Sequence, residues 1–363
     1  MAERNNLYCI IMAGGIGSRF WPLSRTSRPK QFIDILGTGK SLLQQTFERM
    51  EKICPAENIL IVTSNIYHDL VLEQLPKIKS EQILLEPMRR NTAPCIAYAT
   101  YKIQQTNPNA IAIVAPSDHL ILNEDKFVET ILNAVEFAEK QDSLLTLGIK
   151  PSRPETGYGY IQIDKPVKGY SGLHKVKTFT EKPNLELAKV FMDSGEFFWN
   201  SGLFVWSLNS ISKAFDEHLP EISTLFKEAS SSFGSHVENK IIEKTYSECR
   251  NISIDYGIME KAENVFVVCS EFGWSDLGTW GSLYTHVPTN NQGNASLSKN
   301  VKFYNTENTI VSSCNSKMVV VQGLSGYIVV DTNDVLLICK MQDEQQIKNF
   351  VNDIQLEQGE IFS

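Results

Sequence analysis

The sequence predicts an α/β fold: a large first domain with a Rossmann-like, mostly parallel sheet, followed by a small all-β domain. Through the first half of the 363-residue chain, apolar segments of strand length alternate with helical stretches. From about residue 295 the pattern changes to short strands separated by turn residues. The chain is also too long for one ordinary domain. We expect domains at residues 1–290 and 295–363, joined by the polar segment Thr289–Asn294.

The strands expected in the first domain are nearly continuous apolar runs, which are typical of parallel strands covered by helices on both faces. Ligands of such sheets bind at the carboxyl ends of the strands, so the loops after Met12 and Ala115 should share an edge. The expected strands are Leu7–Met12, Ile59–Thr63, Ile83–Leu85, Ile111–Ala115 and Leu144–Gly148. The expected helices are Leu42–Lys52 with Ser41 as N-cap, Pro94–Gln104, and Phe127–Lys140 with an apolar stripe.

The second domain is expected to consist of short strands and a closing helix, which carries Ile347, Phe350, Val351 and Ile354 at helical spacing. Its turns are marked by Asn305, Asn315, Gly323, Gly326 and Asn333. The expected strands are Val301–Tyr304, Thr309–Ser312, Met318–Gln322, Tyr327–Asp331 and Val335–Cys339.

Composition excludes several classes of protein. The net charge of −8, with no basic tract, opposes nucleic-acid binding. No apolar run reaches the ~18 residues of a membrane span, and the first ten residues lack a signal-peptide core. The seven cysteines are scattered and contain no C-x-x-C pair, so neither zinc nor a disulfide framework is indicated. We expect a cytoplasmic protein without a membrane partner.

The most informative segment is the loop after the first strand. It contains Gly14-Gly15-Ile16-Gly17, and it is followed by Ser18, Arg19, Arg25, Arg28 and Lys30. A strand that ends in glycines lets backbone N–H groups approach an anion closely, and nearby cations add charge-assisted hydrogen bonds. The segment therefore predicts a triphosphate site. Its candidate nucleotide-binding residues are Ala13, Gly14, Gly15, Gly17 and Ser18, and its candidate catalytic cations are Arg19 and Lys30.

Two common phosphate-binding motifs do not fit this segment. The dinucleotide fingerprint G-x-G-x-x-G would need glycine where Phe20 stands, which opposes an NAD-dependent dehydrogenase. A P-loop ending in Gly39-Lys40-Ser41 would need glycine at Asp34. A glycine-rich turn alone is weak evidence, but the added cations are hard to explain by packing.

Two aspartates offer oxygen ligands for Mg²⁺. Asp118 follows a buried strand, and Asp276 lies in a glycine-flanked loop between Trp274 and Trp280. Mg²⁺ is commonly bound by one or two carboxylates together with phosphates. The structural alternatives are a turn or cap for Asp118 and a buried hairpin for Asp276. His119 is expected to be structural, since magnesium disfavours imidazole.

The segment from Ala13 to Phe32, AGGIGSRFWPLSRTSRPKQF, resembles the signature of sugar-nucleotide pyrophosphorylases. Its version with Phe20-Trp21-Pro22-Leu23-Ser24-Arg25 and Pro29-Lys30-Gln31-Phe32 resembles mannose-1-phosphate guanylyltransferases in particular. The resemblance implies the transfer of GMP from GTP to mannose 1-phosphate, with release of pyrophosphate. It implies a nucleotidyltransferase domain and a tail like a short left-handed β-helix. It also supports Asp118 and Asp276 as the ligands of a catalytic Mg²⁺.

The same resemblance implies residues for the sugar phosphate. Lys182 matches the lysine that holds the phosphate, and Glu181 would accept hydrogen bonds from sugar hydroxyls. The glycines around Tyr158 would let backbone lie against the hexose, and Asn200 would hydrogen-bond the sugar. For Ser253 and Asp255 a helix-capping role comes first, although the resemblance allows a wall of the sugar pocket. The expected sugar-phosphate site is Gly157, Tyr158, Gly159, Glu181, Lys182 and Asn200.

Guanine presents N1–H and N2–H₂ donors, so a carboxylate acceptor would favour it over adenine. Glu86 is the candidate, with Asn91 and Thr92 nearby at the start of a helix. The same three residues would also suit a plain turn and cap.

Several alternatives remain open at this point. Other hexose-1-phosphate nucleotidyltransferases share the glycine loop, and a non-catalytic regulatory homologue would share the fold. The presence of Arg19, Lys30, Asp118, Lys182 and Asp276 favours an active enzyme. We expect a homodimer. We expect no phosphomannose isomerase activity, because the chain ends at Ser363 without room for a further domain.

Overall fold

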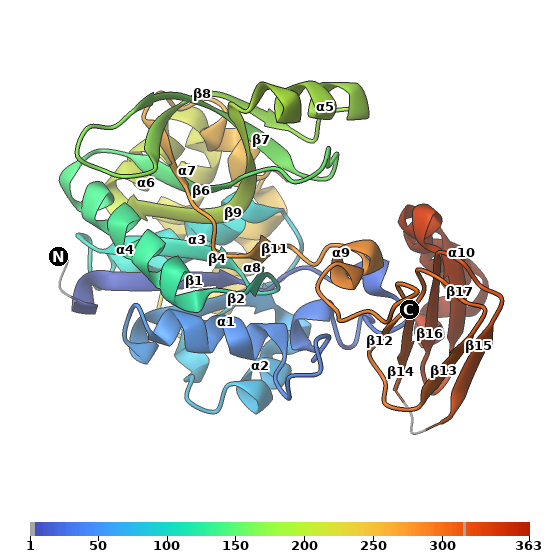
Figure 1. Ribbon diagram of the computed structural model, residues 1–363. Helices are drawn as coiled ribbons and strands as arrows, with labels where there is room; N and C mark the ends of the chain where they lie inside the picture. Colours follow the sequence, from blue (N-terminus) through green and yellow to red (C-terminus); the bar gives the residue numbers. More distant parts are fainter. Residues whose placement is uncertain (1–3, 315–316) are drawn as a thin grey trace. The chain divides into compact units, whose positions relative to one another are not determined.

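The computed structural model describes residues 4–314 and 317–363 and shows two compact units (Figure 1). Asn315, expected in a turn, lies outside the described residues. The first unit consists of the chain up to Gly14, Thr46–Ser117 and Ile121–Trp274. The second consists of Gly15–Gln45, Asp118–Leu120 and Ser275–Ser363. The second unit thus includes segments from well before residue 290, and the domain boundary expected there stays a prediction.

The first unit is built on one nine-stranded sheet of order β3-β2-β1-β4-β9-β6-β10-β8-β7. The five strands expected in the first domain are present as β1, β2, β3, β4 and β6, and their ends differ from the expected ones by at most one residue. The bounds are β1 Leu7–Met12, β2 Ile59–Ser64, β3 Ile83–Glu86, β4 Ile111–Pro116, β6 Leu144–Ile149, β7 Gly159–Pro166, β8 Leu173–Glu181, β9 Phe197–Ser207 and β10 Val265–Cys269.

The prediction of a mostly parallel, Rossmann-like sheet is wrong. The pairings β1–β2, β1–β4, β2–β3 and β6–β10 are parallel, whereas β4–β9, β6–β9, β7–β8, β7–β9 and β8–β10 are antiparallel. The long strand β9 enters between β4 and β6 and runs against both. Because a strand buried on both faces is an apolar run in either direction, the sequence pattern did not reveal this.

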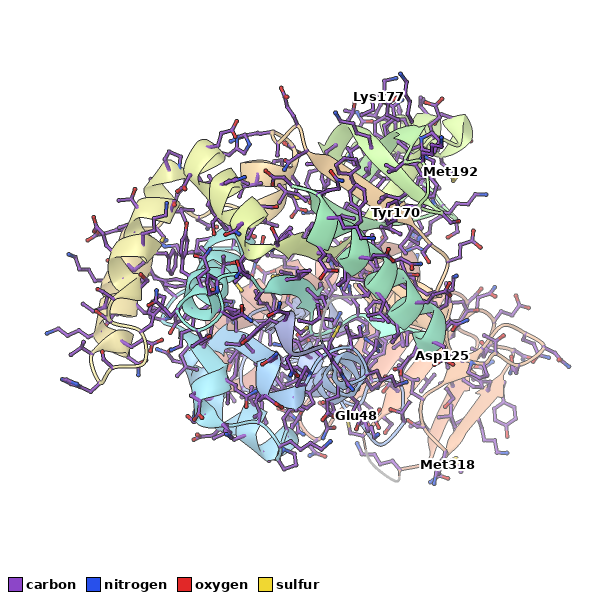
Figure 2. All side chains as sticks on the ribbon, turned by 90° about the vertical axis from the view of Figure 1, so that its left-hand side faces the viewer. Glu48, Asp125, Tyr170, Lys177, Met192 and Met318 are labelled. Carbon is purple, nitrogen blue, oxygen red and sulfur yellow. The ribbon has the colours of Figure 1, made fainter. Side chains whose placement is uncertain are left out.

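Helices cover both faces of the sheet. Ile10, Ala112 and Val114 share one apolar core with α3 (Thr92–Gln104), α6 (Leu208–His218), α7 (Pro220–Ser230) and α8 (Glu238–Glu248). Neighbouring strand residues point the opposite way, yet Cys9, Ile11 and Ile113 are equally buried. The outer faces of the helices are charged, as Glu48 on α1 and Asp125 on α4 illustrate (Figure 2). The other helices before residue 200 are α1 Leu42–Glu51, α2 His68–Gln74, α4 Glu124–Lys140 and α5 Leu185–Ser194.

The second unit contains a small β-helix. Strands from successive turns pair in parallel, so that Val301 lies beside Val319 and Ile310 beside Ile328. This confirms the small β-rich C-terminal part, while its left-handedness stays a prediction. The bounds are β12 Ala295–Ser296, β13 Val301–Tyr304, β14 Ile310–Ser313, β15 Val319–Gln322, β16 Tyr327–Asp331, β17 Leu336–Lys340, α9 Trp280–Tyr284 and α10 Ile347–Gln358. The short strands β5 Leu120–Ile121 and β11 Trp274–Ser275 pair as a two-stranded sheet.

The β-helix shares its core with the segment that follows the glycines. Phe20 and Trp21 are buried in one apolar cluster with Ile328, Val330 and other residues of the C-terminal strands and helix α10. The Trp21 indole Nε1–H donates to the carbonyl of Phe362 at 2.6 Å. The string Phe20–Arg25 is therefore the surface on which the C-terminal part packs. No helix within residues 4–314 and 317–363 has the length and apolar character to cross a membrane.

Candidate active site

The glycine loop begins in the first unit and continues into the second. Ala13 still belongs to the sheet, since its N–H donates to the carbonyl of Val62 at 2.8 Å. Gly15 is exposed, and a Cβ there would meet no atom within 4 Å. Gly17 has a φ of +70°, and a Cβ there would lie 2.5 Å from Cβ of Lys30. Gly15 thus leaves backbone open to a ligand, whereas Gly17 is required by the turn itself.

Lys30 is a buried cation of the second unit that contacts three polar groups. Its side chain is only 4% exposed. The ammonium lies 2.7 Å from Oδ2 of Asp118 and donates to the carbonyls of Asp276 and Leu277 at 2.8 and 3.0 Å. An ammonium has three N–H donors, so all three have acceptors within the protein. The structure therefore brings Lys30 together with the Asp118 carboxylate and the backbone of Asp276. The role of the two aspartates as metal ligands stays a prediction. Lys30, however, is bound to protein groups and is not open to a phosphate.

The two aspartates are held in different ways. Burial opposes the ionisation of Asp118, but the Lys30 ammonium and His119 outweigh it and hold the pKa of that carboxyl below its ordinary value. Oδ1 of Asp276 accepts a hydrogen bond from the N–H of Gly278 at 2.9 Å. The next residue, Leu277, has a φ of 44°, which is strained for a branched side chain. Burial of its side chain and the bond from Lys30 keep it there.

Asp118 and Asp276 are chemically suited to Mg²⁺. Both supply hard carboxylate oxygens, and Asp118 is ionised at neutral pH. The described residues contain no cluster of three or more histidine, cysteine or acidic side chains that could hold an ion.

Arg19 is an accessible cation of the loop. It is exposed, and within residues 4–314 and 317–363 it forms no hydrogen bond or ion pair. Arg25, in contrast, pairs with Asp334 at 2.8 Å and lies over the Trp21 ring. Ser18 opens the short helical turn Ser18–Phe20 and is partly exposed beside Arg19.

Glu86 ends strand β3 in the first unit and is buried. Tyr246 on α8 donates its hydroxyl to Oε1 of Glu86 at 3.1 Å. A Cβ on Gly14 would lie 3.1 Å from Oε2, so the other carboxylate oxygen lies against the start of the glycine loop. Burial raises the pKa of Glu86 to about 7, although Tyr246 and Arg89 counteract it. The carboxylate is positioned and sensitive to pH near neutrality.

Asn91 and Thr92 form the start of helix α3. The Asn91 side chain accepts from the N–H of Thr92, and Asn91 has a φ of 69°. Thr92 Oγ1 accepts from the N–H of Ile254 at 2.9 Å. These contacts confirm the expected helix start. They give both side chains structural partners, so their nucleotide-binding role stays a prediction.

The predicted sugar residues Glu181 and Asn200 lie in one polar cluster of the first unit. Asn200 donates from Nδ2 to Asp255 at 2.8 Å and accepts from Thr146 at 2.9 Å. A Cβ on Gly159 would lie 2.4 Å from Oε2 of Glu181 and 3.4 Å from Cβ of Asn200. Burial and the neighbouring Glu181 raise the pKa of Asp255 to about 6. The cluster offers several oxygen acceptors, as a polyhydroxylated ligand needs.

Lys182, Gly157 and Tyr158 border this cluster. Lys182 has a φ of 49°, and its ammonium pairs with Glu181 at 2.6 Å while 59% of its side chain is exposed. Gly157 is exposed. Tyr158 meets the Trp199 and Trp274 rings edge-on, with centroids 5.2 and 5.4 Å away. The lysine can therefore reach a phosphate, and the aromatic rings give the cluster a rigid wall.

The sequence did not predict the contacts that Asp255, Tyr246 and Leu277 make with the candidate site residues. Asp255 was interpreted first as a helix cap, but its carboxylate binds Asn200. No sequence pattern marked Tyr246 or Leu277 as part of a site, because a buried tyrosine or leucine is ordinarily part of a core. Only a motif such as Ser253–Glu260, which the resemblance had already marked, could have indicated Asp255.

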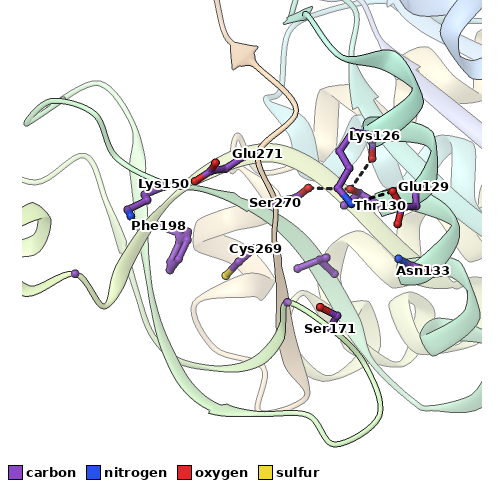
Figure 3. A pocket seen from close by; sticks show the side chains of 13 residues that line it. Lys126, Glu129, Thr130, Asn133, Lys150, Ser171, Phe198, Cys269, Ser270 and Glu271 are labelled. Atoms are coloured by element: carbon purple, nitrogen blue, oxygen red, sulfur yellow. Dashed lines mark hydrogen bonds and ion pairs between the residues drawn. The ribbon is translucent and has the colours of Figure 1, made fainter.

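A separate cavity of about 500 Å³ lies beside helix α4 (Figure 3). Lys126, Thr130, Lys150, Cys269 and Ser270 are among the residues that line it, and Thr130 hydrogen-bonds Ser270 at 2.8 Å. Within the described part of the chain, none of the predicted site residues borders it. Its two lysines lie among Glu129 and Glu271, so no ligand charge is favoured. The cavity is not the candidate active site.

Known proteins that are similar to this chain show which family it belongs to. Residues 8–292 match the nucleotidyl transferase family, and residues 299–354 match the mannose-phosphate isomerase/GMP-like β-helix domain. A mannose-1-phosphate guanylyltransferase of Salmonella montevideo is 37% identical, over 96% of this chain and 74% of that protein. The one from Escherichia coli K12 is 35% identical, over 97% and 74%.

Among solved structures, one from Thermus thermophilus, described as a mannose-1-phosphate geranyltransferase, matches with a TM-score of 0.85. It is 30% identical, and the match covers 96% of this chain and 99% of that one. The mixed sheet, the glycine loop and the β-helix thus define a nucleotidyltransferase. Within that class, the chain belongs to the mannose-1-phosphate guanylyltransferase family.

Gly15 and Gly17 of the loop allow a matched pair of substitutions to be compared. Gly17→Ala should lower the free energy of unfolding by about 1–3 kcal/mol, because it combines a positive φ with a collision against Lys30. Gly15→Ala should leave it nearly unchanged, because the position is open. Urea denaturation of both variants measures the difference. Equal stability of the two would contradict the assigned turn.

Proposed function

We propose that this protein transfers GMP from GTP to mannose 1-phosphate, giving GDP-mannose and pyrophosphate. The observation that carries the proposal is the gathering of Lys30, Asp118 and the Asp276 loop beside the exposed glycine loop. Membership of the family supports the same reaction. Of the alternatives, a regulatory homologue is disfavoured because each charged group that the chemistry needs is present.

The second unit would bind the triphosphate. Backbone N–H groups of the glycine loop and the exposed Arg19 would hold the β- and γ-phosphates and stabilise the departing pyrophosphate. Lys30 keeps Asp118 and the Asp276 loop in place, and would contact a phosphate only by exchanging one of its three acceptors. Lys30 therefore acts first through the residues it holds.

The first unit would bind the acceptor and the base. Lys182 would neutralise the sugar phosphate, and Glu181 and Asn200 would accept and donate hydrogen bonds to the hexose, with Asp255 orienting Asn200. A phosphate oxygen of the sugar phosphate attacks the α-phosphorus in line with the leaving pyrophosphate. Because this nucleophile is already an anion, catalysis requires positioning and charge neutralisation and no general base.

Asp118 and Asp276 would hold Mg²⁺, which would supply charge neutralisation at the reacting phosphates. The ionised state of Asp118 supports this assignment. Glu86 would accept from the guanine N1–H and N2–H₂, with Asn91 and Thr92 shaping the adjacent turn. A homodimer and a cytoplasmic location remain predictions.

The proposed reaction is tested by pyrophosphate release from a matrix of nucleoside triphosphates and hexose 1-phosphates. GTP with mannose 1-phosphate should give the highest kcat/KM. A clear preference for another pair would refute this assignment but keep the reaction class. Release with no pair would leave the regulatory homologue as the better interpretation.

Asp118→Asn should lower kcat by about 10²–10³-fold, because it removes a charge at the reacting phosphates while keeping an oxygen for Lys30. Asp125→Asn, an exposed change on α4, is the matched control and should be active. Steady-state turnover at saturating substrates measures both. Wild-type turnover in Asp118→Asn would exclude this residue from the mechanism.

The base site should depend on pH through Glu86. Its carboxyl is an acid with a raised pKa of about 7, so it is ionised above that pH and becomes protonated below it. KM for GTP should therefore rise as pH falls from 8 to 6, approaching about tenfold per unit below the pKa. KM for mannose 1-phosphate is measured in parallel. It reports separately on the protonation of Asp255, because the pKa of that carboxyl is about 6.

Glu86→Gln should remove the pH dependence of KM for GTP and reduce the preference for GTP over ATP. The loss of a hydrogen bond to a charged acceptor corresponds to about 1.5–3 kcal/mol, or roughly 10–100-fold in the ratio of kcat/KM values. The glutamine amide also matches the donor and acceptor of adenine. An unchanged ratio would show that Glu86 does not read the base.

A further inference from the structure

The C-terminal part of the second unit contacts the loops that carry the proposed phosphate chemistry. We call residues Ala295–Ser363 the β-helix tail. Phe362 of the tail accepts the indole hydrogen bond of Trp21, and Asp334 pairs with Arg25. Both partners lie between Arg19 and Lys30 in the sequence. The tail is thus fastened to the glycine-loop segment at two points.

A third contact reaches the segment that follows Asp276. Glu344 of the tail, in the helical turn Met341–Gln346, accepts the backbone N–H of Gly281 through Oε2 at 2.7 Å. Gly281 is in the first turn of α9, where backbone N–H groups lack partners within the helix. A Cβ at Gly281 would lie 3.1 Å from both carboxylate oxygens, so the approach is close. A carboxylate at a helix N-terminus is also favoured electrostatically.

Helix α9 connects this contact to the charged centre. Trp280, its first residue, is fully buried and meets the Phe20 ring, with centroids 5.2 Å apart. The Lys30 ammonium lies 5.7 Å from the centre of the same Phe20 ring and binds the carbonyls of Asp276 and Leu277. The segment from Asp276 to Gly281 is therefore fixed at one end by Lys30 and at the other by Glu344.

We propose that Glu344 is a positioning residue of the phosphate site: it holds helix α9, and through it the Asp276 loop, in the arrangement used for catalysis. The inference rests on the proposed function, since it gives Asp276 a catalytic role. The β-helix tail is then a working part of the phosphate site and not only an appended domain. Because a shift of about 1 Å at reacting groups can cost ~10²-fold in rate, one distant hydrogen bond can control turnover.

The test compares Glu344→Ala, Glu344→Gln and Asp343→Ala in pyrophosphate release, with each protein's melting temperature measured first. Asp343 is exposed in the same helical turn and is the matched control. Glu344→Ala should lower kcat about 10–100-fold while KM for mannose 1-phosphate stays near the wild-type value. Glu344→Gln keeps an oxygen for Gly281 and should recover most of kcat. Asp343→Ala should match the wild type.

A Glu344→Ala protein that is folded and has wild-type kcat would overturn the inference, as would Glu344→Gln being as impaired as Glu344→Ala. If Glu344→Ala does not fold, the variant Gly281→Ala tests the inference in its place. It disturbs the same contact from the other side and should lower kcat in a folded protein, so wild-type kcat there also overturns the inference. The wild type separates failure of this inference from failure of the proposed function. If the proposed function is wrong, the wild type itself releases no pyrophosphate from GTP and mannose 1-phosphate.

Discussion

The ammonium of Lys30 is the interaction on which the candidate phosphate site depends. It joins three segments that are far apart in the sequence, at residues 30, 118 and 276–277, through one carboxylate and two carbonyl oxygens. A buried charge is tolerated only when it is fully paired, and removing one partner of such a pair typically costs about 3–5 kcal/mol. The loop from Gly15 to Lys30, Asp118 and the strained Leu277 therefore have to fold together. The same bonds that stabilise the unit also set where its carboxylates lie.

The proposed site residues are divided between the two compact units. The groups proposed for phosphate and metal belong to the unit that contains the β-helix, whereas the groups proposed for base and hexose belong to the unit that contains the large sheet. Positive φ angles at residues other than glycine mark the same loops, at Asn91, Lys182 and Leu277. Such conformations persist only where surrounding contacts enforce them. Here a helix cap at Asn91, the backbone hydrogen bond from Lys182 to Tyr158 and the bond from Lys30 to Leu277 are those contacts.

The string Phe20–Arg25 shows how a family signature can have a structural cause. The resemblance associated this string with mannose 1-phosphate, and family membership agrees. Within the second unit, however, Phe20 and Trp21 pack in the core of the β-helix, and Arg25 pairs with Asp334. In this chain the string forms the surface on which the tail packs. Arg25 and Lys30, which had looked like free phosphate-binding cations, both have protein partners.

The sequence by itself determined the local elements and the chemical inventory. Strands β1 and β13, the start of α3 and the Ser41 cap follow from apolar periodicity and capping residues, which act over a few neighbours. The glycine loop and both aspartates were recognised from residue type and order. Strand direction was not determined, because a buried strand such as β9 has the same pattern whether parallel or antiparallel. Only the tertiary structure decided that Lys30 is enclosed, that Tyr246 holds Glu86 and that Glu344 reaches Gly281. These contacts join residues far apart in the chain, and no local pattern specifies them.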